Sequence, residues 1–91
     1  MERRSIRLSG RVQGVGFRAF VHGLALEMGL AGFVRNDGDG VYVEIEGQPE
    51  VLARFAQRLV AETPRLARVD STESDSIAPE GSKRFEIQPS R

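Results

Sequence analysis

The sequence has no cysteine, no tryptophan and a single histidine, His22. The lack of cysteine excludes a disulfide framework, a thiolate metal site and a cysteine nucleophile, and one histidine alone cannot form a zinc site. No apolar run approaches the ~20 residues that a helix needs to cross a bilayer. Residues 1–10 lack the apolar region of a signal peptide. We therefore expect a cytoplasmic protein with no metal site and no membrane partner.

The chain is short, with 91 residues. This length allows one hydrophobic core, and it excludes a two-lobed kinase, a TIM barrel and a complete doubly wound dinucleotide-binding domain. Hydrophobic residues make up 40% of the sequence and charged residues 29%, which is an ordinary balance for a globular domain. We expect a single domain over residues 1–91.

Positive charge is concentrated at one end of a chain whose net charge is zero. Residues 1–35 contain six arginines and two glutamates, a local net charge of +4. The overall balance argues against a nucleic-acid partner, because a polyanion-binding domain is strongly basic. The local excess, which coincides with a cluster of glycines, favours a small anion bound near the N-terminus.

The pattern of apolar residues predicts three strands in the first half of the chain. Apolar and polar side chains alternate at residues 5–12 and 41–46, and a shorter strand is expected at 32–36. Gly10 interrupts the first alternation, which indicates a β-bulge or the close approach of another backbone. Residues 37–40, Asp-Gly-Asp-Gly, are typical of a tight antiparallel hairpin rather than of a calcium loop.

Helical spacing predicts two helices, at residues 17–28 and from residue 49 up to the proline at 64. We expect a weak edge strand at 66–72, a loop at 75–82 and a closing strand at 83–88 with its apolar side chains facing inward. The weak and closing strands should share the last position of the sheet. The order β-α-β-β-α-β predicts an α+β fold, the ferredoxin-like αβ plait, with two helices on one face of an antiparallel sheet.

The chemistry is expected in residues 10–18, Gly-Arg-Val-Gln-Gly-Val-Gly-Phe-Arg. Here a strand runs into a glycine turn that opens a helix, so that backbone N–H groups point into one concavity. Arg18 lies in the first helical turn, where the helix dipole disfavours a cation by ~0.3–1 kcal/mol. We infer from this placement that the Arg18 guanidinium binds a phosphate. On spacing alone, the alternative of a surface arginine beside a tight turn stays open.

Two nucleotide-binding motifs overlap this loop. Residues 14–19 satisfy the dinucleotide fingerprint, but that motif requires a following parallel strand, whereas a hairpin is predicted here. Residues 13–20 are similar to a segment of the RNA-recognition motif, but its stacking aromatics lie after the first helix. The sequence also lacks the Gly-Lys-Ser/Thr of a nucleotide P-loop. We expect none of these activities.

Residues 10–18, residues 32–36 and Gly40 together resemble the acylphosphatase family, and the resemblance extends to residues 85–87. It implies a metal-independent enzyme without a cofactor that hydrolyses small-molecule acyl phosphates, with carbamoyl phosphate as a candidate natural substrate. Inorganic phosphate would then be a product and an inhibitor. The resemblance also implies that Asn36 orients the attacking water and that the phosphate is held by Arg18 and the loop formed by Gln13, Gly14, Val15, Gly16, Phe17 and Arg18.

Residues 36–41, 64–71 and 85–90 are similar to a subgroup, the N-terminal acylphosphatase-like domain of the hydrogenase maturation carbamoyltransferase. This similarity adds a second hypothesis from a different functional class. The chain would then be a non-catalytic phosphate-binding or docking domain of a larger carbamoyltransferase. We accordingly expect either a monomer or part of a multidomain protein.

Other polar residues are expected to have no chemical role. His22 should face solvent from the first helix. Arg35 should lie on the opposite face of its strand from Asn36, because successive side chains of a strand alternate. The open face of the sheet should be formed by Tyr42, Glu44 and Glu46, either as an ordinary solvated surface or as an interaction surface in a larger protein.

Overall fold

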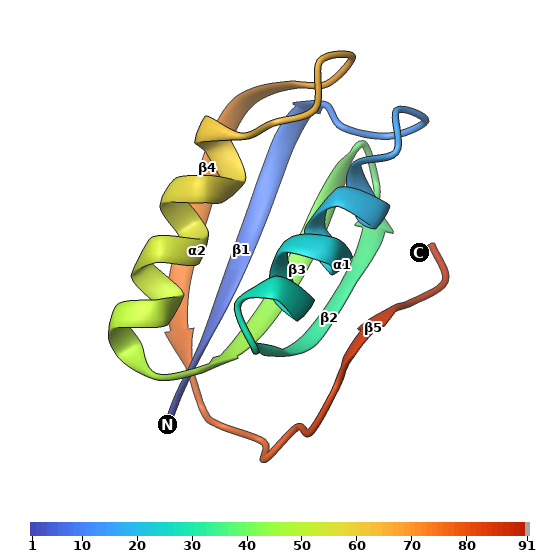
Figure 1. Ribbon diagram of the computed structural model, residues 1–91. Coiled ribbons are helices and arrows are strands. Elements are labelled where there is room, and N and C mark those ends of the chain that lie inside the picture. Colours follow the sequence, from blue (N-terminus) through green and yellow to red (C-terminus); the bar gives the residue numbers. More distant parts are fainter. Residues whose placement is uncertain (91) are drawn as a thin grey trace.

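The helices and strands follow one another along the chain in the predicted order (Figure 1). The computed structural model describes residues 1–90; the last residue of the predicted domain, Arg91, lies outside the described residues. The elements are β1 (Glu2–Arg11), α1 (Phe17–Glu27), β2 (Ala31–Asp37), β3 (Gly40–Gly47), α2 (Pro49–Ala61), β4 (Arg68–Ile77) and β5 (Phe85–Ile87).

The five strands form one sheet in the order β4-β1-β3-β2-β5. β1 pairs antiparallel with β3 and β4, and β2 pairs antiparallel with β3, whereas β5 runs parallel to β2. The αβ plait is confirmed, but the sheet is mixed rather than wholly antiparallel. The weak and closing strands lie at opposite edges instead of sharing a position, because residues 78–84 cross one end of the sheet between them (Figure 1).

β4 is longer than predicted. It begins at Arg68 and continues to Ile77, so residues 75–77 belong to a strand and not to a loop. Most side chains of β4 are exposed, and the strand is held to β1 by backbone pairing from Arg68 to Ile77. Backbone hydrogen bonds do not depend on side-chain polarity. An exposed edge strand therefore lacks the apolar alternation on which the prediction relied.

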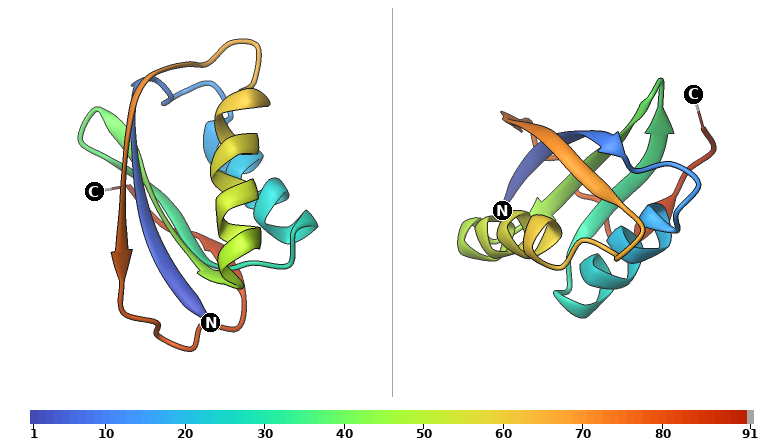
Figure 2. Two further views of the ribbon diagram at one scale, coloured as in Figure 1. Left: turned by 90° about the vertical axis from the view of Figure 1, so that its left-hand side faces the viewer. Right: turned by 90° about the horizontal axis from the view of Figure 1, so that it is seen from above.

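Both helices pack on the same face of the sheet (Figure 2). The apolar stripes predicted for them are the buried ones: Phe17, Val21, Leu24 and Ala25 on α1, and Leu52, Phe55 and Leu59 on α2. Neither helix within residues 1–90 is both long and apolar enough to cross a membrane. The hydrophobic core lies between the helices and the sheet and includes, from the strands, Ile6, Leu8, Val34, Val41, Val43, Ile45 and Phe85.

Gly10 has a φ of +131°, and the pairing of β1 with β4 changes register between Ser9 and Gly10. A Cβ atom at this position would lie 2.2 Å from the backbone oxygen of Arg68. The predicted bulge and the predicted close backbone approach are therefore both present. The bulge ends the regular part of β1 just before the glycine-rich loop.

The face of the sheet without helices is not simply solvated. Arg3 and Glu46 are only 2% and 5% exposed, and Glu44 is half-buried. Residues 78–84 cover this end of the sheet: the N–H groups of Glu80 and Gly81 donate hydrogen bonds of 2.8 and 2.9 Å to the Glu46 carboxylate. The prediction of an open surface is wrong for Glu46, because a segment remote in sequence lies across it.

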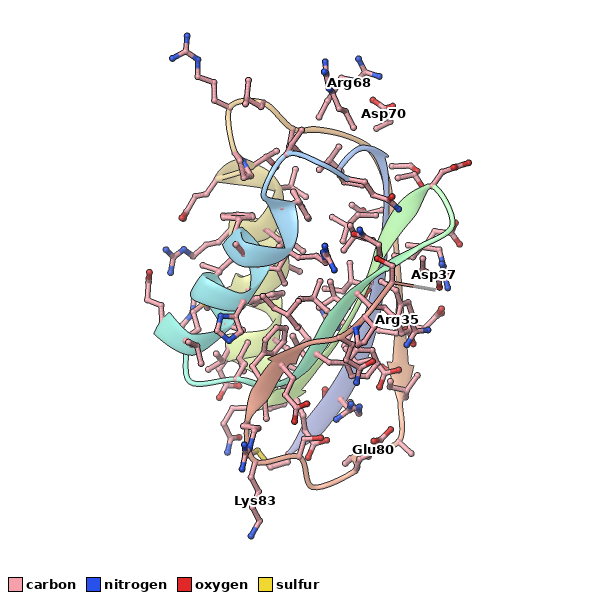
Figure 3. The ribbon with its side chains drawn as sticks, turned by 90° about the vertical axis from the view of Figure 1, so that its right-hand side faces the viewer. Arg35, Asp37, Arg68, Asp70, Glu80 and Lys83 are labelled. Carbon is pink, nitrogen blue, oxygen red and sulfur yellow. The ribbon has the colours of Figure 1, made fainter. Side chains whose placement is uncertain are left out.

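Two further expectations have different outcomes. His22 is half-buried, with its ring centroid 6.0 Å from that of Phe85, so it is less exposed than expected. Arg35 does lie on the helix-free face. Its guanidinium is 4.6 Å from the ring centroid of Tyr42 and 5.4 Å from that of Phe33. Figure 3 shows Arg35 beside Asp37, the last residue of β2.

Candidate active site

The loop between β1 and α1 lies beside the β2–β3 hairpin at one end of the sheet (Figure 1). Ile87 of β5 lines the same pocket as the loop. Gly14 and Gly16 have φ values of +73° and +77°, and Gly16 is the N-cap of α1. Residues with a side chain rarely adopt this left-handed conformation. The glycine pattern found in the sequence is therefore required by the path of the chain into the helix.

The backbone N–H groups at the start of α1 are available for a ligand. Among the described residues, no acceptor is found for the N–H groups of Gly14, Val15, Gly16, Phe17 or Arg18, and the first bond into the helix is Phe20 N–H to Gly16 O. Within residues 1–90, α1 also has no side-chain cap and no acidic residue in its first turn. The positive end of the helix dipole is thus uncompensated, which favours an anion.

A pocket of about 290 Å³ lies at this end of the helix. Arg18 is half-buried and forms part of its wall. Within residues 1–90, the Arg18 guanidinium has no ion-pair partner, which is also true of Arg4, Arg11, Arg54, Arg65 and Arg84. The pocket is lined by Val12, Gly14, Gly16, Phe17, Arg18, Ala19 and Ile87.

Asn36 lies near the end of β2, opposite Val41 of β3. It is two residues from the buried Val34, so it faces the same side of the sheet as the helices. Its Oδ1 atom is buried and, in the part of the chain that the structure describes, has no hydrogen-bond partner. A buried acceptor without a partner is costly, and it indicates a place where water or a ligand donates.

The side-chain amide of Gln13 is hydrogen-bonded to the β2–β3 hairpin. Its Nε2 atom donates hydrogen bonds of 2.7 Å to the backbone oxygen of Gly38 and 2.8 Å to that of Gly40. Among the predicted phosphate-binding residues, Gln13 can therefore offer only its backbone N–H to a ligand. Val15 is half-buried and packs against the hydrophobic core.

The structure places the predicted residues on two neighbouring elements. Gly14, Gly16, Phe17 and Arg18 line the pocket, and Asn36 lies on the nearby end of β2 without being part of the pocket wall. Ile87 lies on the same face of β5 as the buried Phe85, as predicted, but it is 46% exposed and borders the pocket, which sequence reasoning missed. Its position follows from the parallel pairing of β5 with β2, which no local pattern in the sequence indicates.

No group of three or more His, Cys, Asp or Glu side chains within residues 1–90 is arranged to hold a metal ion. The charge available at the pocket comes from the Arg18 guanidinium and the helix N-terminus. Such a site can bind a phosphate group through several N–H donors and one guanidinium fork.

The family to which the chain belongs follows from comparison with known sequences. A family model described as acylphosphatase matches residues 4–87. The chain belongs to the acylphosphatase family. The acylphosphatase of Thermus thermophilus is 46% identical over 81 residues, covering 88% of this chain and 91% of that protein. The carbamoyltransferase HypF2 of Cupriavidus necator is 52% identical over 73 residues, covering 80% of this chain and 9% of that protein.

Solved structures of acylphosphatases and carbamoyltransferases share the fold. Full-length HypF in its phosphate- and nucleotide-bound form superimposes with a TM-score of 0.95 and 34% identity over 98% of this chain and 12% of that one. Bacillus subtilis acylphosphatase superimposes with a TM-score of 0.91 and 34% identity over 97% and 99% of the two chains. The chain thus spans about a tenth of the carbamoyltransferases and nearly the whole length of these acylphosphatases.

Proposed function

We propose that this chain hydrolyses acyl phosphates to a carboxylate and inorganic phosphate, and that residues 1–91 form one acylphosphatase-like domain. The observation that carries the proposal is the pocket that combines free N–H groups of the glycine loop with the unpaired guanidinium of Arg18. The likeness to acylphosphatases that this chain matches over most of their length supports it.

The phosphate of the substrate binds to the N–H groups of residues 13–18 and to Arg18. An acyl phosphate is already activated, because its leaving group is a carboxylate. Its transition state is loose and resembles metaphosphate, with charge spread over the equatorial oxygens. Catalysis therefore depends on positioning and on donors that meet this charge, which the helix N-terminus and the guanidinium supply.

Asn36 orients the water that attacks phosphorus. Its Oδ1 atom is buried without a partner among residues 1–90, and it would accept a hydrogen bond from that water. The oxygen of water forms a bond to phosphorus while the bond between phosphorus and the acyl oxygen breaks, and the carboxylate leaves with the electron pair. An amide cannot take the proton of water at neutral pH. The proton therefore passes to a phosphate oxygen or to solvent.

The proposed reaction needs no metal and no cofactor. The support is that the Arg18 guanidinium and the free N–H groups supply positive charge and donors for a phosphate at the pocket. The substrate is a small-molecule acyl phosphate, with carbamoyl phosphate the natural candidate, and inorganic phosphate is the product and a competitive inhibitor. The support for carbamoyl phosphate is the 52% identity to a protein named as a carbamoyltransferase.

The same likeness favours a second candidate function. Because the chain matches 9% of that carbamoyltransferase, it could act as a phosphate-binding or docking domain whose chemistry needs the remainder of a larger protein. Both functions use the same pocket, so only turnover separates them.

Phosphate release from benzoyl phosphate, with and without EDTA, tests the proposal. Turnover that EDTA leaves unchanged is expected, and a parallel assay with carbamoyl phosphate tests the natural substrate. Complete absence of turnover with phosphate binding retained would favour the docking domain. Turnover abolished by EDTA would refute the metal-free mechanism.

A further inference from the structure

The side chain of Gln13 connects the phosphate loop to the β2–β3 hairpin. Its one amide nitrogen donates to two backbone oxygens, at 2.7 Å from Gly38 and 2.8 Å from Gly40. Both acceptors are carbonyls, so the end of the amide that faces them must be its NH₂ group, which carries two donors. The arrangement joins residues 25 and 27 positions apart in the sequence.

The two carbonyls belong to the hairpin that ends the strand of Asn36. Gly38 follows Asn36 by two residues, and Gly40 precedes Val41, the residue paired with Asn36 across the hairpin. The contact therefore holds the turn of the hairpin, next to the Asn36–Val41 pair. In the sequence, Gln13 immediately precedes the loop residues with free N–H groups, several of which line the pocket.

We propose that Gln13 is a positioning residue that sets the place of Asn36 relative to the phosphate loop. The inference rests on the proposed function for its kinetic consequence. In-line attack requires the water and the phosphorus to be aligned, and a misplacement of about 1 Å can reduce a rate by about 10²-fold. The water is held from β2 and the phosphate from the loop, so a contact between these two elements controls that alignment.

The replacement Gln13→Met tests this role, because methionine keeps the length of the side chain and removes both donors. Gln13→Glu is less suitable, since a negative charge beside the pocket would also weaken phosphate binding. We expect kcat for benzoyl phosphate to fall about 10-fold or more, while the inhibition constant of inorganic phosphate changes by less than about 2-fold. The control Gln57→Met, an exposed change on α2, should leave both unchanged.

A double-mutant cycle identifies the residue through which Gln13 acts. If Gln13 positions Asn36, then Gln13→Met should reduce kcat by less than about 2-fold once Asn36 has been replaced by alanine, because the two losses overlap. Losses that multiply independently would contradict the proposal. A rise in the phosphate inhibition constant with kcat unchanged would also contradict it, because Gln13 would then serve phosphate binding alone.

Backbone order parameters of Gly38 and Gly40 give a readout that does not depend on turnover. We expect them to fall in Gln13→Met and to remain as in the parent in Gln57→Met. Unchanged values in both variants would show that the hairpin is held without Gln13 and would overturn the proposal. If the parent lacks acylphosphatase activity, the proposed function fails, while this measurement still decides whether Gln13 fixes the hairpin.

Discussion

The guanidinium of Arg3 donates a hydrogen bond of 2.9 Å to the carboxylate of Glu46, and both side chains are buried on the helix-free face of the sheet. A second bond of 2.8 Å reaches Glu44, and a third of 2.9 Å reaches the hydroxyl of Ser82. These contacts fasten residues 78–84 to the sheet and so guide the chain from β4 to β5. The network thereby fixes the edge strand that brings Ile87 to the pocket.

Replacing Arg3 by methionine should destabilise the fold strongly. The substitution leaves buried carboxylates without their cation, and breaking a buried ion pair from one side costs about 3 kcal/mol or more. Urea denaturation measures the change. The matched control is Arg58→Met, which removes exposed ion pairs to Glu27 and Glu62 and should cost much less. Equal losses in the two variants would contradict the account of the Arg3 network.

Glu46 should make stability depend on acid pH. The pKa of its carboxyl is held below the ordinary 4.5, first by the N–H of Glu80 and then by Arg3. A carboxyl whose pKa is lower in the folded state stabilises the fold above the unfolded pKa and loses that contribution as pH falls through the folded pKa. The free energy of unfolding should therefore decline below pH 4.5.

Denaturation curves measured from neutral to acid pH check this expectation. Glu46→Gln should be less stable than the parent at neutral pH and should show a shallower acid decline, because one group with a lowered pKa has been removed. Glu62 also has a lowered pKa, through Arg58, but its side chain is 46% exposed. Glu62→Gln should change the acid decline less. A parent-like decline in Glu46→Gln would refute the assignment.

Arg18→Ala should remove a charge-assisted contact to the substrate phosphate. We expect a loss of ~3 kcal/mol or more in transition-state stabilisation, the size found when one preorganised electrostatic donor is removed. Inorganic phosphate should also inhibit the variant less than the parent. Steady-state kinetics with benzoyl phosphate measure both effects, and a folded variant with near-parental activity would show that the anion site is assigned wrongly.

Asn36→Ala should separate catalysis from stability. If Asn36 contacts water and not phosphate, kcat should fall about 10²-fold or more while KM changes little. Because its Oδ1 is buried without a partner among residues 1–90, losing this atom should not lower the free energy of unfolding by more than about 1 kcal/mol.

Thermal unfolding measured beside the kinetics distinguishes a water-orienting Asn36 from one that only shapes the hairpin. A turn-forming amide predicts a large loss of stability with a modest loss of rate. A rise in KM alone would place Asn36 among the phosphate-binding residues instead.

Features that have a local sequence pattern could be predicted from the sequence, whereas contacts between polar residues far apart in the sequence could not. The apolar stripes of α1 and α2, the hairpin at 37–40 and the bulge at Gly10 each have a local pattern. No local pattern indicates the burial of Arg3, because the residues that cover it, 78–84, come from the other end of the chain. No local pattern indicates the pairing of β5 with β2 either. A strand of three residues with two apolar positions could pair at either edge of the sheet.

The same distinction between local patterns and remote contacts applies to the candidate site. The glycines and Arg18 occur in one continuous segment, so their proximity follows from the turn into α1. The position of Asn36 at the same end of the sheet depends on tertiary structure and was expected only through the family resemblance. The bonds of Gln13 to Gly38 and Gly40 were not foreseen at all, because a polar side chain in a loop carries no signal of its partner.

The most direct test of the mechanism is to hydrolyse benzoyl phosphate in water labelled with ¹⁸O. Attack on phosphorus by a water held at Asn36 places the label in inorganic phosphate and leaves benzoate unlabelled. Mass spectrometry of both products reads the outcome in one experiment. Label found in benzoate would mean attack at the acyl carbon, and the roles given to Arg18, the loop amides and Asn36 would then be contradicted.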